Sequence, residues 1–456
     1  MKVLRCGRAW LLWVLWLLPA AAAADDLHYQ DFIVGDEAFA LGGAYTAIAA
    51  DPSGGWYNPA GIVDVRDTSL SLSANLYGLQ DNSTGKTAFV DPEKAISKLS
   101  VVPSSAGFVQ ALGRSSLNGR RPYAIGLSLV VPSYRKFSLS EEGAVEDSEL
   151  GLVQSGYTRN YTDSTLWIGA LGAMRLNRRF SLGLGLFLIH RSVQDSASSW
   201  VASGHDGGEF RTFRSALTEL DFSNDALVLA LGLKWEWFEG FYFGAMVRSP
   251  SLPIYSHGSM RFARSWAAPD QPPSFRPTPD EVSVDSETRS WGEARVGVAY
   301  VIEKRLKLAA DVSVHLPVHY TLVQVSDPVS RDALLVPADI ERTFVINGNL
   351  GVEVLFADAF SIGLGGFTNF SSVGAIPAEV DRPHPAHVNM YGGTFAVGYA
   401  SEHTLTRIGV LYSYGEGQDV HAVNDPSQLD TDTQGFIRVP LTQSYLYFFL
   451  SSTFRY

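Results

Sequence analysis

Residues 41–62 read LGGAYTAIAADPSGGWYNPAGI and lie between an apolar N-terminus and a long series of alternating segments. Glycine pairs, an Asp-Pro break and the turn Asn58-Pro59-Ala60-Gly61 interrupt this stretch, so it is too rich in helix breakers to form one long helix. We therefore expect a compact segment, a plug, around which the rest of the chain is arranged.

The first 24 residues have the composition of a secretory signal peptide. Basic residues precede an apolar run from Ala9 to Leu18, and a string of small residues ends at Ala24. The apolar run is about half of the ~20 residues that a membrane-spanning helix needs. We expect cleavage after Ala24, which removes Cys6, the only cysteine, and excludes disulfides and cysteine chemistry from the mature chain. Losing three basic residues takes the formal charge from −12 to −15, which argues against nucleic acid as a partner.

The remaining chain is rich in hydrophobic residues but lacks helical membrane spans. Hydrophobic residues make up 46% of the sequence and charged residues 18%, yet no later run approaches 20 consecutive apolar residues. In lipid, every backbone polar group must find a partner within the protein, so only helices and closed barrels span a membrane. The composition therefore predicts an all-β chain that forms a transmembrane β-barrel.

The barrel prediction depends on the alternation of apolar and polar side chains. In residues 306–318 the even positions are apolar, whereas Lys307 and Asp311 lie among the odd ones, a period of two that fits a strand and not a helix. One later segment breaks phase at Gly392-Gly393, where we expect a β-bulge. The fourteen predicted antiparallel strands are 68–77, 104–112, 121–132, 164–176, 179–194, 225–239, 241–252, 291–302, 306–319, 342–356, 360–371, 387–401, 405–416 and 445–456.

The connections between these strands alternate between short turns and long polar stretches. The long ones are 78–103, 133–163, 195–224, 253–290, 320–341, 372–386 and 417–444. Outer-membrane barrels have short periplasmic turns and long external loops, so the pattern predicts seven external loops and two periplasmic termini. The last strand ends at the aromatic Tyr456, resembling the signature by which such barrels are recognised for assembly, and we expect it to close the barrel against the first strand.

A barrel of fourteen strands needs something to fill its lumen. Eight strands enclose packed side chains and sixteen to eighteen enclose an aqueous channel, so fourteen lie between these cases. Residues 25–66 precede the first strand and are expected to fill the lumen, with Gly183, Gly185, Gly363 and Gly365 on the inner face making room. The predicted organisation is a signal peptide (1–24), a plug (25–66) and a transmembrane barrel (67–456), forming a monomer.

The glycine pair at 42–43, the Asp51-Pro52 break and the WYNPAG run at 56–61 together resemble the N-terminal hatch of the FadL/TodX family. This family comprises outer-membrane transporters of long-chain fatty acids and aromatic hydrocarbons. The resemblance implies passive uptake of a hydrophobic small molecule, most simply a long-chain fatty acid. External loops, here 195–224 and 253–290, catch the ligand, the hatch shifts, and the ligand leaves into outer-membrane lipid through a gap near a kinked third strand, here 121–132.

Site residues follow from the resemblance and from strand phase. The hatch role falls on Asn58, Pro59, Ala60 and Gly61. Two basic residues with inward phase, Arg295 and Lys307, are candidates for contact with a ligand headgroup. The neighbouring acids Glu293 and Asp311 offer a simpler explanation, ion pairing, which we favour.

No sequence motif indicates catalysis, a cofactor or a metal. His315 and His319 share a strand face but lie about 13 Å apart, too far for one metal ion, and His384 with His387 has no evident third ligand. We expect no enzyme activity, no cofactor and no metal. Two alternatives remain open: a non-transporting barrel acting as a secretion shuttle or scaffold for partner proteins, and a membrane-embedded hydrolase assembled from distant strands.

Overall fold

The computed structural model describes most of the chain beyond residue 27. The described residues are 28, 30, 32–84, 101–114, 121–147, 151–205, 209–268, 271–277, 282–302, 305–324, 339–356, 359–380, 384–423 and 435–455. The signal peptide predicted at 1–24 and the first residues of the predicted plug lie outside this set.

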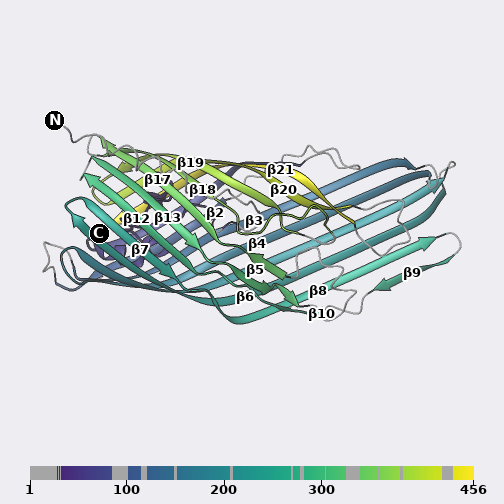
Figure 1. The fold of residues 1–456 in the computed structure, drawn as a ribbon, viewed down its shortest axis with the longest axis horizontal. Coiled ribbons are helices and arrows are strands. Elements are labelled where there is room, and N and C mark those ends of the chain that lie inside the picture. The colour runs from purple at the N-terminus through teal and green to yellow at the C-terminus, as the bar shows by residue number, and fades with distance from the viewer. Residues whose placement is uncertain are drawn as a thin grey trace, which may run out of the picture.

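Fourteen antiparallel strands pair with their neighbours in chain order and close into a barrel (Figure 1). Closure occurs between the first and last strands, whose pairing runs from Ser69 opposite Arg455 to Thr84 opposite Leu441. The fourteen-stranded antiparallel barrel predicted from the sequence is therefore confirmed. Its strands are β1 (Thr68–Thr84), β2 (Val101–Leu112), β3 (Tyr123–Asp147), β4 (Gly151–Arg175), β5 (Phe180–His205), β6 (Glu209–Phe238), β7 (Phe241–Arg248), β12 (Glu293–Ile302), β13 (Leu306–His315), β17 (Val345–Phe356), β18 (Phe360–Asn369), β19 (His387–Ala400), β20 (Thr404–Val423) and β21 (Gly435–Arg455).

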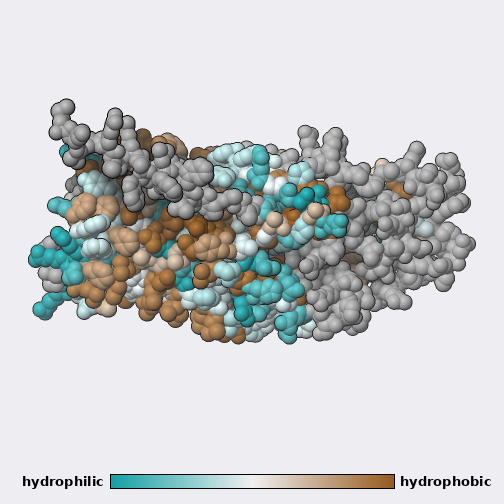
Figure 2. Space-filling view, viewed as in Figure 1, coloured by the Kyte–Doolittle hydropathy of each residue, from teal (hydrophilic) through white to brown (hydrophobic). Residues whose placement is uncertain are grey.

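The barrel wall is apolar outside and polar inside over part of its length. On β1, Leu70 and Leu72 are 48% and 60% exposed, whereas the alternating residues Ser69 and Ser71 are buried. Figure 2 shows hydrophobic side chains gathered over one half of the molecule, between a hydrophilic rim and hydrophilic residues near the middle. Leucines on the outside and serines on the inside reverse the order of a water-soluble protein, as lipid contact requires.

Several strands are much longer than the sequence pattern predicted. β3, β4, β5 and β6 have 25, 25, 26 and 30 residues, and their far halves project from one end of the barrel (Figure 1). The prediction that the long polar connections 133–163 and 195–224 are external loops is therefore wrong for most of those residues, which continue the strands. Beyond the apolar band the exposed side chains are mostly polar, for example Asn160, Gln194 and Asp221, so the outward apolar positions that mark a lipid-facing strand are lost although the backbone pairing continues.

The projecting sheet has a small apolar core of its own. β8 (Leu252–Ala268) pairs with the outer half of β6, so residues 253–268 of another predicted connection are strand as well, followed by β9 (Gln271–Pro277). Short pairs lie beside this sheet: β10 (Val282–Ser283) with β8, β11 (Asp285–Ser286) with β15 (Val323–Gln324), and β14 (Val318–Thr321) with β16 (Asp339–Arg342). Phe222, Met260 and Tyr320 are among the buried residues of this core.

The β-bulge predicted at Gly392-Gly393 is absent from β19. Its pairing with β18 and β20 passes through both glycines without a shift of register. Tyr391 and Phe395 are both exposed on the same face, with Gly393 between them. The apparent break of phase was a missing side chain and not a change of backbone register.

Residues 32–66, here called the N-terminal segment, lie within the strand wall. The segment contains α2 (Asp36–Ala40), α3 (Gly54–Tyr57) and the 3-10 helix η1 (Pro59–Asp64), and most of its side chains are buried. Three inward glycines lie against its backbone: an added Cβ would meet Ala60 N at 2.2 Å from Gly183, Ala40 O at 2.5 Å from Gly363 and Gly42 N at 2.1 Å from Gly365. No helix in the described residues is long and apolar enough to cross a membrane.

Candidate functional site

Ion pairs bind the α2 end of the N-terminal segment, here called its base, to the barrel wall. The first turn of α2 carries Asp36 and Glu37, and both are buried. Arg407 on β20 donates to Asp36 at 3.1 Å and to Glu353 at 2.6 Å. Lys307 on β13 lies 3.0 Å from both Glu37 and Glu353. This network joins one end of the segment to three wall strands.

The turn at Asn58 joins the segment both to itself and to the wall. The Asn58 side chain is fully buried; its amide nitrogen donates to Thr46 O at 2.9 Å and to Leu233 O of β6 at 2.8 Å. Its side-chain oxygen accepts from Ala60 N at 3.1 Å and so caps η1, with Pro59 at the first position of that helix. An asparagine is needed here because only an amide supplies two donors and an acceptor at one position.

A second ionic contact lies at the end of η1. The carboxylate of Asp64 lies 2.5 Å from Arg175 on β4 and 2.5 Å from Lys234 on β6. Burial alone would raise the pKa of Asp64, but the two cations more than offset it and hold the pKa below its ordinary value. Asp64 is therefore charged at neutral pH and ties η1 to two strands.

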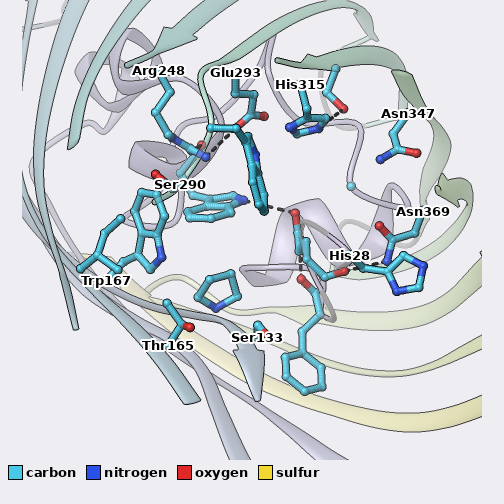
Figure 3. A pocket seen from close by; sticks show the side chains of 18 of the residues that line it. His28, Ser133, Thr165, Trp167, Arg248, Ser290, Glu293, His315, Asn347 and Asn369 are labelled. Atoms are coloured by element: carbon cyan, nitrogen blue, oxygen red, sulfur yellow. Dashed lines mark hydrogen bonds and ion pairs between the residues drawn. The ribbon is translucent and has the colours of Figure 1, made fainter. Parts of the chain in front are cut away.

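A cavity lies between the N-terminal segment and the projecting sheet (Figure 3). It encloses about 1390 Å³ free of protein atoms, including space open to solvent. Its floor includes Phe32, Trp56 and Tyr57 of the segment, and its walls come from seven or more strands and the stretch 288–291. In Figure 3, Trp167, Arg248, Glu293, His315, Asn347, Asn369 and His28 are arranged around the cavity, with other lining side chains drawn between them. The lining is therefore amphipathic, with aromatic rings beside charged groups.

The charged groups of the cavity are mostly positive. Six arginines and two carboxylates line it among the described residues, a formal excess of four positive charges with the histidines neutral. Glu293 lies 2.5 Å from Arg248 and 2.9 Å from Arg295, so one carboxylate serves two guanidinium groups. Arg191 and Asp163 form a separate two-bonded pair at 2.8 and 3.1 Å.

Aromatic rings line the same space and contact these arginines. The Arg248 guanidinium lies 4.2 Å from the ring centre of Trp56 and 5.1 Å from that of Trp167. The two indole rings meet edge to face at 5.1 Å, and Arg295 lies 5.1 Å from the Tyr57 ring. Flat apolar surfaces and cationic groups within one cavity favour a ligand that has an apolar body and a polar or anionic group.

The wall changes its pairing next to this cavity. In the described residues β2 pairs with β3 only from Leu112 opposite Tyr123 to Ser105 opposite Val130. The pairing of β3 with β4 shifts register between Val130 and Ser133, around Pro132, which lines the cavity. Proline has no backbone N–H to give to a ladder, so the seam between β2 and β3 ends where the third strand is irregular.

The predicted residues fall at different places. Asn58, Pro59, Ala60 and Gly61 lie in the segment beneath the cavity, and an added Cβ at Gly61 would meet Ala49 O at 1.9 Å. Arg295 lines the cavity and is paired with Glu293, as favoured from the sequence.

Lys307 lies at the base of the segment and does not line the cavity, since its nitrogen is taken up by Glu37 and Glu353. Asp311, its expected partner, instead accepts hydrogen bonds from the backbone N–H of Tyr45 at 2.9 Å and from the backbone N–H and the hydroxyl of Thr46.

Sequence reasoning missed Arg248, Trp167 and Arg191. Each has the inward phase of its strand, as Arg295 has, so the alternation held a signal for all three. Their convergence came only from barrel closure, which places β4, β5, β7 and β12 around one space. Trp56 was within the quoted motif, but its role at the cavity floor depends on the fold of α3.

No family model matches the sequence, and no curated protein does. Among solved structures the chain is similar to a FadL homologue of Pseudomonas aeruginosa, with 13% identity, a TM-score of 0.58, and coverage of 95% of this chain and 100% of that one. It is similar to the toluene transporter TodX of Pseudomonas putida, with 12% identity, a TM-score of 0.56 and coverage of 93% and 99%. It is also similar to the toluene transporter TbuX of Ralstonia pickettii, with 13% identity, a TM-score of 0.54, and coverage of 93% of this chain and 99% of that one.

These likenesses extend over nearly the whole of each chain. At such low identity they show the fold and not a shared ligand. The chain therefore has the fold of the FadL-type transporters, and the structural resemblance expected from the sequence is confirmed.

Proposed function

We propose that this chain is an outer-membrane channel for the passive uptake of hydrophobic molecules, and that long-chain fatty acids are its ligands. The observation that carries the proposal is the amphipathic cavity between the N-terminal segment and the projecting sheet, within a FadL-type barrel. Transport rather than catalysis fits the solved structures of this fold that are described as transporters, including those for toluene.

The route begins at the projecting end of the barrel, which we assign to the cell exterior, with both termini periplasmic. An acyl chain gains about 0.8 kcal/mol per CH₂ on leaving water, so the apolar part of the cavity lining draws it from solution. Trp56 and Trp167 offer surfaces for the chain, and Arg248 and Arg295 offer partners for a carboxylate. Among the predicted ligand contacts, Arg295 keeps this role in the proposal and Lys307 anchors the segment.

The exit in this proposal is the end of the β2–β3 seam. Pro132 and Ser133 line the cavity at the register shift of β3, so cavity and irregular wall are adjacent. A ligand leaving there passes directly into lipid and avoids water, which suits an acyl chain better than a wet pore. Residues 25–66 act as a hatch in this scheme, with the turn Asn58-Pro59-Ala60-Gly61 as the part that moves. The channel works as a monomer.

Uptake of labelled oleate tests the proposal. The barrel is inserted into liposomes that hold a fatty-acid-binding trap, and the initial rate is compared with liposomes that carry a small barrel without a lumen. We expect a rate at least several times that of the control, and competition from unlabelled oleate. A rate equal to the control, from a barrel shown to be folded by its heat-dependent shift on a gel, refutes transport of this ligand.

Toluene in place of oleate separates the two ligand classes of the fold. If toluene enters the liposomes faster than in the control and oleate does not, the chain is still a channel but its ligand is an aromatic hydrocarbon and not a fatty acid. If neither oleate nor toluene is taken up and the barrel stably binds a secreted protein, the scaffold alternative is favoured.

A further inference from the structure

We propose that Arg248 links recognition of a ligand's anionic group to release of the N-terminal segment, so that this channel responds to amphipathic anions and not to neutral molecules of equal size. The inference rests on the proposed function and assigns a role within the same cavity. It follows from the contacts of one side chain with three residues and from one buried donor atom.

Arg248 is a cavity arginine that donates a hydrogen bond to the backbone of the segment. It is the last residue of β7, and its side chain is 4% exposed. One terminal nitrogen lies 2.5 Å from Glu293, and the other donates to the backbone carbonyl of Trp56 at 2.6 Å. Trp56 lies in α3, two residues before Asn58, so the arginine holds the chain next to the turn that caps η1.

The guanidinium is not fully satisfied by these contacts. Its Nε atom is buried without a hydrogen-bond partner in the described structure. Glu293 also serves Arg295, so the group of three carries one unit of positive charge in excess. A carboxylate entering the cavity therefore meets a cation with a donor to spare and with one bond to a neutral carbonyl.

The competition between the two acceptors is unequal. Both bonds have a charged donor, but only the carboxylate carries a full negative charge and can accept two parallel hydrogen bonds from the planar guanidinium. The incoming anion takes the place of the Trp56 carbonyl, while Trp56 and Trp167 keep the guanidinium between their rings. The chain from Trp56 to Asn58 then loses one of its bonds to the wall.

Arg191 provides the matched comparison. It lines the same cavity, it is buried, and it is paired with an acid, Asp163. It also donates to the Thr288 hydroxyl at 3.4 Å, which is not part of the segment. Removing its charge lowers the positive potential of the cavity without breaking a bond to the segment.

The test compares oleate with oleyl alcohol on four full-length barrels in detergent: wild type, Arg248→Gln, Arg248→Lys and Arg191→Gln. Each carries Arg66→Cys labelled with bimane, because Arg66 is exposed at the end of the segment and the mature chain is expected to hold no cysteine. Affinity is measured with tritiated ligands, and movement of the segment by the bimane emission.

In wild type we expect oleate to bind about tenfold more tightly than oleyl alcohol, the difference of about one charge-assisted hydrogen bond, and only oleate to shift the emission. Arg248→Gln brings the affinity ratio close to one and leaves the emission near its oleate-bound value without ligand. Arg248→Lys retains a preference for oleate but loses most of the shift, because an ammonium cannot contact carboxylate and carbonyl as a planar fork does. Arg191→Gln keeps the wild-type shift.

Equal shifts with oleate and oleyl alcohol in wild type overturn the inference, as does a wild-type response from a folded Arg248→Lys barrel. In either case oleate binding and uptake leave the proposed function standing. If wild type binds no oleate, the proposed ligand and the inference fail together.

Discussion

Replacing Gly183 by alanine adds one methyl group where β5 meets the N-terminal segment. The new Cβ would lie 2.2 Å from Ala60 N and 2.3 Å from the carbonyl carbon of Pro59. Both are backbone atoms, so the segment has to move by about 1 Å or more to restore van der Waals distance. The substitution acts on the turn that we assign to hatch movement and leaves the ligand-contacting side chains in place.

The expected magnitude combines two opposing effects. Overpacking of this kind costs about 1–3 kcal/mol, while alanine in a strand gains about 0.5–1 kcal/mol over glycine. The difference, about 0–2.5 kcal/mol with a midpoint of about 1.3 kcal/mol, falls on docking of the segment. A difference of about 1.4 kcal/mol corresponds to a tenfold change in an equilibrium. The displaced state of the segment is therefore expected to be about tenfold more populated.

Gly172 on β4 is the matched control, because nothing lies within 4 Å of an added Cβ there. Both variants are placed in planar bilayers, and ion conductance reports how often the lumen opens. Gly183→Ala is expected to raise the open fraction about tenfold, and Gly172→Ala to leave it unchanged. Equal conductance in Gly183→Ala, Gly172→Ala and wild type would refute the reasoning that the segment closes the lumen.

Three further predictions concern the contacts of the segment. Asn58→Asp keeps the acceptor for Ala60 but sets a carboxylate against the carbonyls of Thr46 and Leu233, so we expect about 1–3 kcal/mol of weaker docking, seen as faster proteolysis of the segment; unchanged proteolysis would contradict this. Lys307→Met removes the ion pairs with Glu37 and Glu353, which lie outside the cavity and hold the segment, so we expect faster proteolysis of the segment and an unchanged ratio of oleate to oleyl alcohol affinity. An altered ratio would place Lys307 at the ligand. Folding lowers the pKa of Asp64, so its ion pairs with Arg175 and Lys234 stabilise docking of the segment fully above the unfolded pKa of about 4. This stabilisation is lost progressively as the pH falls below about 4. Conductance should therefore rise below about pH 4 in wild type, and less steeply in Asp64→Asn.

The sequence predicted the barrel well because lipid imposes a strict pattern on the wall. Leu70 and Leu72 alternate with serines over the apolar band, and fourteen such stretches gave the correct strand count. The same rule failed above the band. In the outer half of β6, near Asp221, the alternation is reversed: Leu220 and Phe222 are buried and the exposed face is polar, so the pattern does not mark a lipid-facing strand.

The site was less accessible from the sequence. Asn58 could be singled out because a turn motif is local, and its capping bond to Ala60 spans two residues. The cavity is not local, since Trp56 and Arg248 are 192 positions apart and meet only after the barrel closes. Strand phase alone marked Arg295 and Lys307 as equivalent; their separation into cavity and base reflects how far along each strand the residue lies.

The central claim, that hydrophobic cargo passes only when the N-terminal segment moves, is tested most directly by tying the segment to the wall. Thr46→Cys and Gly297→Cys are the pair to test, because an added Cβ at Gly297 lies 3.0 Å from the Cβ of Thr46, about half an ångström short of the range for a disulfide. The added Cβ also lies 2.1 Å from Asp311 Oδ1, so the Asp311 side chain has to rotate away. Labelled oleate uptake is measured on the double variant before and after oxidation, and again after reduction. We expect oxidation to abolish uptake and reduction to restore it; an oxidised, fully cross-linked barrel that imports oleate at the reduced rate would contradict the account.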